Sequence, residues 1–177
     1  MRVEFANPFG FAKLDIEGAG DGLLETAIWD RTGAQFNLQF IPPATGLYLV
    51  EAPFFAVGSY FVIADDGPCN DKRAQLGCDV YLVVLQGDAA LPATGGSPIS
   101  WIIQKDVTNE SILDNVSFGD RLATDLTPLT QGVVATVQVN FIINEYVNGG
   151  GSIASANFDR PVGEIWCPWA DISWIPS

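Results

Sequence analysis

Apolar and polar residues alternate most regularly in the stretch 132–147, where residues such as Gln138 and Asn140 are each flanked by apolar neighbours. A period of two residues is typical of a β-strand that has one face on a core and the other in water. The glycine-rich stretch 148–151 then predicts a hairpin loop, with 152–158 as the returning strand. We expect the most regular strand of the protein here.

Short apolar runs separated by turn residues fill the first half of the chain. Closely spaced runs of this kind are typical of an antiparallel sandwich. The residues 30–33 predict a hairpin turn that ends at Gly33, and the prolines at 42–43 end another strand. The strands that we expect are 13–17, 23–29, 35–41, 47–52, 60–64 and 79–86.

One weakly charged stretch, 46–64, is long enough to span a bilayer as a helix. It contains Glu51, Pro53 and Gly58, which fit a lipid-exposed helix poorly. We therefore predict two strands and a turn in this stretch, and no membrane span.

The stretch 87–98 is rich in Gly, Ala and Pro, and it predicts a linker or a long loop. We divide the chain into a sandwich at 1–87, a linker or long loop at 88–100 and a second, hairpin-rich β region at 101–177 with an aromatic arm. In the second region we predict a short strand at 101–103, a helical turn at 108–113 and irregular chain at 120–131. We expect that this region does not complete the fold of the first.

The composition supports an all-β fold. Hydrophobic residues make up 48% of the 177 residues and charged residues only 16%, so the chain can bury a core of ordinary size. The 18 glycines and 11 prolines supply the turns that many short strands need. The fold class that we predict is all-β, an immunoglobulin-like or related antiparallel sandwich followed by a second mainly β region.

The charge of the chain is strongly negative. Eight Lys and Arg residues against 21 Asp and Glu residues give a net charge of −13, which repels a phosphate backbone, so we expect no nucleic-acid partner. Negative charge keeps an apolar protein soluble, and cation binding is the alternative interpretation. The residues 1–8 contain an acidic residue and a proline instead of the apolar core of a secretion signal, so we expect no such signal.

Few residues suited to catalysis are present. The chain has no histidine, which removes Ser-His-Asp and Cys-His catalysis and the commonest metal ligand. Asp65, Asp66, Asp71 and Asp79 lie close together in the sequence, and we interpret them as a solvated loop, with calcium binding as the alternative. We expect no enzyme activity, no cofactor and no metal site.

The three cysteines cannot all pair within one chain. Cys69 and Cys78 bracket a polar loop, which allows either a local disulfide or two free thiols. Cys167 lies between Trp166 and Pro168, and we expect it to be a buried apolar residue.

Part of the first region resembles a known family. The segments 45–48 (Thr-Gly-Leu-Tyr) and 56–62 (Ala-Val-Gly-Ser-Tyr-Phe-Val) and the acidic turn 65–67 resemble the later strands of immunoglobulin-like sandwich modules of bacteriophage tail and head proteins. The resemblance covers about residues 13–86. It implies that Tyr60 packs at a corner at the start of a core strand. The paired core cysteines of antibody domains are missing, so only the architecture carries over.

The end of the chain is rich in tryptophan. Tryptophan is enriched in protein interfaces. We therefore expect the segment 161–177 to dock on a neighbouring subunit, while sugar stacking and simple core packing are the alternatives. The residues of this possible assembly interface are Ile165, Trp166, Trp169, Ile172 and Trp174.

The resemblance and the lack of catalytic residues together predict a structural component of a virus particle. A bacteriophage tail, neck or head-decoration protein that acts in the virion through protein–protein assembly fits best, with other virion proteins and further copies of the chain as partners. The alternative is a glycan-binding sandwich module of a surface or extracellular protein.

Overall fold

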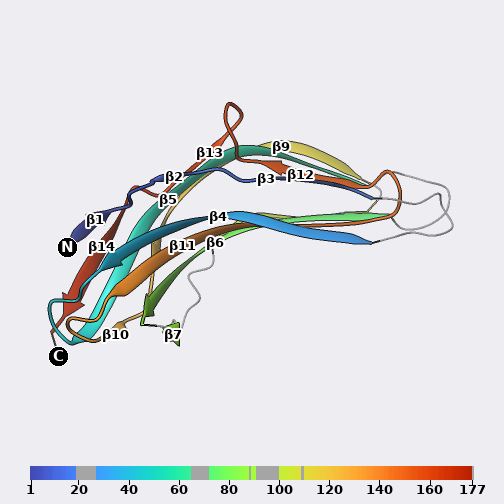
Figure 1. The fold of residues 1–177 in the computed structure, drawn as a ribbon. Helices are drawn as coiled ribbons and strands as arrows, with labels where there is room; N and C mark the ends of the chain where they lie inside the picture. The colour runs from blue at the N-terminus through green and yellow to red at the C-terminus, as the bar shows by residue number, and fades with distance from the viewer. Residues whose placement is uncertain (19–26, 65–71, 88, 91–99, 109, 177) are drawn as a thin grey trace.

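The protein folds as two antiparallel β-sheets packed face to face, which a computed structural model shows as two long curved layers (Figure 1). The structure describes residues 1–18, 27–64, 72–87, 89–90, 100–108 and 110–176. No helix occurs in these ranges. The prediction of an all-β sandwich is confirmed.

The first sheet consists of four rows of strands, because several of its strands are short segments that follow one another along the same line. The central strand β5 pairs on one side with β9 and β10, and on the other side with β12, β13 and β14. These last three pair in turn with β3, β2 and β1, which form the edge. The bounds are β1 Arg2–Glu4, β2 Phe9–Gly10, β3 Lys13–Glu17, β5 Gly46–Ile63, β9 Ser111–Ala123, β10 Thr127–Leu129, β12 Ile153–Asn157, β13 Glu164–Trp166 and β14 Trp169–Ile175.

The second sheet also has four rows. Its strand β11 pairs with β4 on one side and with β6 on the other, and β6 pairs with β7 and β8. The bounds are β4 Ile28–Phe40, β6 Arg73–Gln86, β7 Ala89–Ala90, β8 Ser100–Thr108 and β11 Ala135–Asn148.

The chain passes repeatedly between the two sheets. It runs from the β1–β3 edge to β4, back to β5, across to β6, and after β8 returns to β9 before it crosses to β11 and again to β12. Two four-row antiparallel sheets connected in this order form a jelly roll. Both termini lie at the same end of the sandwich (Figure 1).

The core lies between the sheets and follows from the alternation of side chains along the strands. In β11 every second residue, from Ala135 to Val147, is buried, as the sequence pattern predicted. Aromatic rings link the two sheets: the ring centroid of Phe141 in β11 lies 6.0 Å from that of Phe54 in β5 and 4.8 Å from that of Phe158.

The predicted division into two regions is wrong. Strand β5, from the first region, pairs with β9 over the range 51–63, and β11, from the second region, lies between β4 and β6. Residues 101–177 therefore complete both sheets that residues 1–87 begin. Most of the predicted linker, residue 88 and 91–99, lies outside the described residues. The sequence contained many strands, but it did not show which of them pair.

Several local predictions also fail for one reason, which is that strands of this sandwich are longer than the apolar runs. The predicted turn 30–33 lies inside β4, the predicted turn in 46–64 lies inside the single strand β5, and most of the predicted helical turn 108–113 belongs to strands β8 and β9. The predicted hairpin partner of β11 is β12, which instead joins the other sheet, between β3 and β5.

Residues 13–86 do not form an immunoglobulin-like unit of their own, because none of β3, β4, β5 and β6 pairs with another member of this group. Tyr60 is buried on the core side of β5, three residues before the strand ends. The hydrogen bond expected of a corner tyrosine is made by Tyr48, whose hydroxyl donates to the carbonyl oxygen of Ala44 at 2.6 Å.

Candidate functional site

The outer face of the first sheet is unusually apolar for a surface that faces water. Strand β5 buries its even-numbered residues, so its odd-numbered residues point outward. The outward set includes Phe55 and Val57, whose exposed fractions are 39% and 45%. Isolated exposed apolar residues are ordinary, whereas a contiguous group indicates a contact surface.

Three aromatic rings stack across adjacent strands on this face. The ring of Trp166 in β13 lies 5.2 Å from that of Phe55 in β5 and 6.4 Å from that of Phe9 in β2. The register explains the contact, because Trp166 is directly opposite both phenylalanines. We call Phe9, Phe55, Val57 and Trp166 the aromatic patch.

Arginine and two shallow hollows border the aromatic patch. The guanidinium of Arg160 lies 5.3 Å from the centre of the Phe9 ring. A hollow of about 440 Å³ lies between Val57 and the loop 160–164. A second hollow of about 410 Å³ is lined by Phe61, Ile63 and the loop end of β9, where Leu113 is 80% exposed. Aromatic residues and arginine are the types enriched at protein interfaces.

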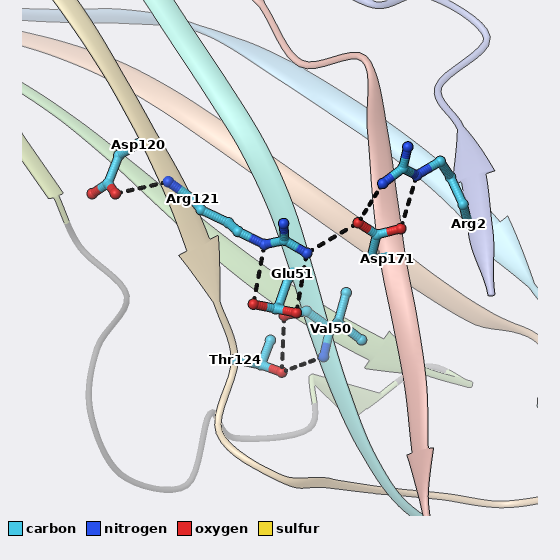
Figure 2. A network of polar contacts seen from close by, with 7 residues as sticks. All are labelled: Arg2, Val50, Glu51, Asp120, Arg121, Thr124 and Asp171. Carbon is cyan, nitrogen blue, oxygen red and sulfur yellow. Dashed lines mark hydrogen bonds and ion pairs between the residues drawn. The ribbon is translucent and has the colours of Figure 1, made fainter.

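A network of ion pairs crosses the same sheet beyond the patch (Figure 2). Arg121 in β9 donates to Glu51 in β5 at 3.1 Å and to Asp171 in β14 at 3.0 Å, and Arg2 in β1 donates to Asp171 at 2.9 Å. The guanidinium of Arg2, acting mainly through its hydrogen bond, lowers the pKa of Asp171. The network links all four rows and holds as many positive as negative charges.

Behind this network, Thr124 ties the end of β9 to the buried side of β5. Its hydroxyl accepts a hydrogen bond from the backbone N–H of Val50 at 3.1 Å (Figure 2). The backbone N–H of Thr124 donates to the carbonyl oxygen of Val50 at 2.9 Å. The buried hydroxyl therefore serves the fold rather than a ligand.

The outer face of the second sheet has a different character. Its outward residues on β4 and β11 are largely amides, and some of them bond to one another. The amide of Gln35 donates to the side chain of Asn140 at 2.7 Å and accepts from Asn37 at 3.2 Å. The two outer faces are therefore chemically distinct, one apolar and one polar.

The predicted assembly interface at the end of the chain is only partly placed on the surface. Ile165 and Ile172 point into the core of the same subunit and are 0% and 3% exposed, so their assignment to an interface is wrong. Trp166 belongs to the aromatic patch, and Trp169 is half-buried under the guanidinium of Arg2. Trp174 is 48% exposed and lies over Gly46.

The segment 161–177 does not project from its own subunit as a separate arm. Strands β13 and β14 pair with β5 of their own chain. Trp166 and Trp169 lie in the same row of this sheet, formed by β13 and β14, and Trp174 lies near the end of β14.

The cysteines and the acidic loop do not form a reactive site among the described residues. Cys78 is a free thiol in the core, whose pKa is raised by burial, and Cys69 lies outside the described residues. Cys167 is buried as expected, and burial raises its pKa to about 12. Asp65, Asp66 and Asp71 lie outside the described residues, within which no group of three potential metal ligands occurs.

Sequence reasoning missed Phe9, Phe55, Val57 and Leu113 as surface residues. The signal was present for β5, where apolar residues occupy both the odd and the even positions from 54 to 57. A strand that is apolar on both faces is normally covered on both faces. Periodicity alone does not say which strand lacks a cover, so the sequence did not single out these residues.

Comparison of the chain with protein-family models, with curated proteins and with solved structures found no match. Within the described ranges, no helix is both long and apolar enough to cross a membrane.

Proposed function

We propose that this protein is a structural component of a virus particle, of the kind found in bacteriophage tails, necks or head decorations, and that it works by assembly rather than catalysis. The observation that carries the proposal is the exposed aromatic patch on one face of a jelly-roll sandwich. Jelly rolls form viral capsid domains and also lectin domains, so the fold supports the proposal by analogy only.

The partner that the aromatic patch fits best is a second copy of the chain. Stable interfaces bury roughly 800 Å² on each partner, which requires most of a sheet face rather than one pocket. The apolar surface extends along the sheet from Phe9 to Leu113, which gives a long contact of this type.

The charges on this face also allow two copies to approach each other. Although the chain carries a net charge of −13, the four basic side chains on this face and its rim are each paired with a carboxylate. Repulsion between copies is therefore weaker here than the net charge suggests. These basic residues are Arg2, Lys13, Arg121 and Arg160.

The first prediction concerns this contact. Replacing Phe55 by Lys places a charge in the centre of the aromatic patch, and we expect the oligomer to dissociate while the fold is kept, because the Phe55 side chain is partly exposed. The measurement is molar mass by analytical ultracentrifugation over a range of protein concentrations. The matched control is Ile41→Lys, since Ile41 is 60% exposed and follows β4 of the other sheet.

A wild-type protein that stays monomeric at every concentration would contradict self-assembly, as would a Phe55→Lys variant with unchanged mass. The neighbouring genes test the wider assignment. Packaging and tail genes would support the virion, whereas a polysaccharide locus would contradict it and favour the glycan-binding alternative.

A further inference from the structure

A groove with unpaired polar groups lies on the outer face of the second sheet, away from the aromatic patch. It has a volume of about 310 Å³ and runs across β4, β11, β6 and β8 near one end of the sandwich. Ligand pockets start at about this size. Trp29 stands at one side of the groove with 63% of its surface exposed, which is a large exposure for tryptophan. We call this feature the Trp29 groove.

The strand register explains how the groove forms. Outward side chains in one row across the sheet are Trp29, Tyr146, Gln75 and Asp106, and the next row includes Asn144, Gly77 and Gln104. Gly77 has no side chain, so the second row is open at its middle and the neighbouring side chains form the walls. Because adjacent strands lie about 4.8 Å apart, the four strands span roughly 14 Å.

Three polar side chains of the Trp29 groove have no hydrogen-bond partner among the described residues. These are the side chains of Asn144, Gln104 and Tyr146. Elsewhere on the same face the amides bond to one another, as in the pair Gln35 and Asn140. An amide offers both donors and acceptors, and a tyrosine hydroxyl offers both as well.

One carboxylate in the groove is held in a fixed position. The guanidinium of Arg73 donates to Asp106 at 2.8 Å, and the Gln75 amide donates to it at 2.9 Å. The hydrogen bond from Arg73 is the main cause that lowers the pKa of Asp106 to about 2. Asp106 therefore remains an acceptor at every pH of interest, and the positive charge of Arg73 is already compensated.

We infer that the Trp29 groove binds a neutral pyranose glycan. A pyranose ring has an apolar C–H face, which can stack on an exposed indole, and a rim of hydroxyls that both donate and accept hydrogen bonds. The groove offers this combination: an indole on one side, then amides, then a fixed carboxylate. Its width accommodates a short oligosaccharide rather than a single ring.

A neutral glycan fits better than an acidic one. The chain has a net charge of −13. Of the cations near the groove, Arg73 is paired with Asp106. Arg31 lies at the edge of the second row and acts on Asp79 only through its charge. Burial raises the pKa of Asp79, and the positive charge of Arg31 lowers it. Lys105 also lines the groove. The negative net charge and the fixed carboxylate of Asp106 therefore favour a neutral ligand over an acidic one.

The test is titration of the full chain with four trisaccharide probes: cellotriose, mannotriose, chitotriose and the acidic sialyllactose. Binding is measured by calorimetry and saturation-transfer NMR, which do not depend on tryptophan fluorescence. We expect at least one neutral probe to bind, and Trp29→Ala and Asn144→Ala each to weaken it by about tenfold or more. The matched control, Trp174→Ala, removes an exposed tryptophan at the opposite end and should leave binding unchanged.

The inference is overturned if no neutral probe binds at about 10 mM, a concentration that would reveal even very weak binding. It is also overturned if Trp29→Ala binds as well as the wild type, if Trp174→Ala weakens binding equally, or if sialyllactose is preferred. The Phe55→Lys variant should keep binding, so this inference and the assembly proposal can fail independently.

Discussion

At the scale of single residues, Glu145 is the most unusual feature of the core. It is the only glutamate among the fully buried described residues, at 0% exposure, and neither of its carboxylate oxygens has a hydrogen-bond partner there. Burial, together with the negative charges of Asp15 and Asp30, raises its pKa to about 8. The backbone of Ala156 lowers this pKa, but its effect is smaller than that of burial. The side chain is therefore mostly protonated at neutral pH.

This pKa predicts how stability depends on pH. The ordinary value is 4.5, so between pH 4.5 and about 8 the folded protein retains a proton that the unfolded chain has lost. The free energy of unfolding should therefore fall as the pH rises through this window, and level off above it. At pH 9 we expect Glu145→Gln to be more stable than the wild type by up to ~5 kcal/mol, at 1.36 kcal/mol for each pKa unit.

The second prediction is tested by urea unfolding from pH 4 to pH 9, which gives the free energy of unfolding at each pH. This range covers the two pKa values of Glu145, 4.5 in the unfolded chain and about 8 in the folded protein. The control is Glu17→Gln, because Glu17 is exposed at the end of β3. If Glu145→Gln and the wild type kept a constant difference over the whole range, the assignment of the proton to Glu145 would be wrong.

At the scale of strands, the periodicity of the sequence was enough to locate β11 and to say which of its faces is buried. It failed at Gly33 and Gly58, which signalled turns but lie inside strands. In both cases a neighbour occupies the space of a side chain: a Cβ on Gly33 would lie 2.2 Å from the carbonyl oxygen of Phe141, and one on Gly58 would lie 2.7 Å from the ring of Phe158. Such glycines allow close approach rather than a turn.

The third prediction follows from this close approach. Gly33→Ala should lower the free energy of unfolding by roughly 2–3 kcal/mol, because β4 must move away from β11 to admit the methyl group. Gly87→Ala is the comparison, since nothing lies within 4 Å of its added Cβ and only its φ of 64° opposes the change. It should cost about 1 kcal/mol.

Thermal and urea unfolding of both variants measure the two costs. Equal stability of Gly33→Ala and the wild type would show that the two strands are not held as closely as the structure has them. If Gly87→Ala lowered the free energy of unfolding more than Gly33→Ala, backbone conformation would matter more than crowding for the stability of these glycine variants.

At the scale of the whole molecule, the pairing of the strands could not be predicted from the sequence. Every partner of β5 comes from beyond residue 110, and the sequence separation reaches 128 residues at the β14 end, where Ile175 lies opposite Leu47. Alternation along a strand says which residues are buried, but it does not say against which strand. The candidate sites depend on that pairing, because both the aromatic patch and the Trp29 groove combine residues from three or more strands.

The pairing also changes the role of the C-terminal segment, which forms part of the sheet instead of an arm for a neighbour. Strands β1 and β2 pair only with β14 and β13 among the described strands. Deleting residues 164–177 therefore removes the partners of the N-terminal strands as well as the buried side chains of Ile165 and Ile172. We expect this truncated chain to lose cooperative unfolding and to aggregate.

Two point variants make the last prediction independent of whether the truncated chain is soluble. Ile172 is buried and Trp174, two residues later in β14, is 48% exposed. Ile172→Ala should lower the free energy of unfolding by ~2–4 kcal/mol, as the loss of a buried isoleucine does, without changing the oligomer mass. Trp174→Ala should cost roughly 1 kcal/mol or less, because about half of its surface stays in water. Urea unfolding and ultracentrifugation of the two proteins measure both quantities. The opposite result, a stable Ile172→Ala variant together with dissociation of the oligomer by Trp174→Ala, would show that the segment docks on a neighbouring subunit after all.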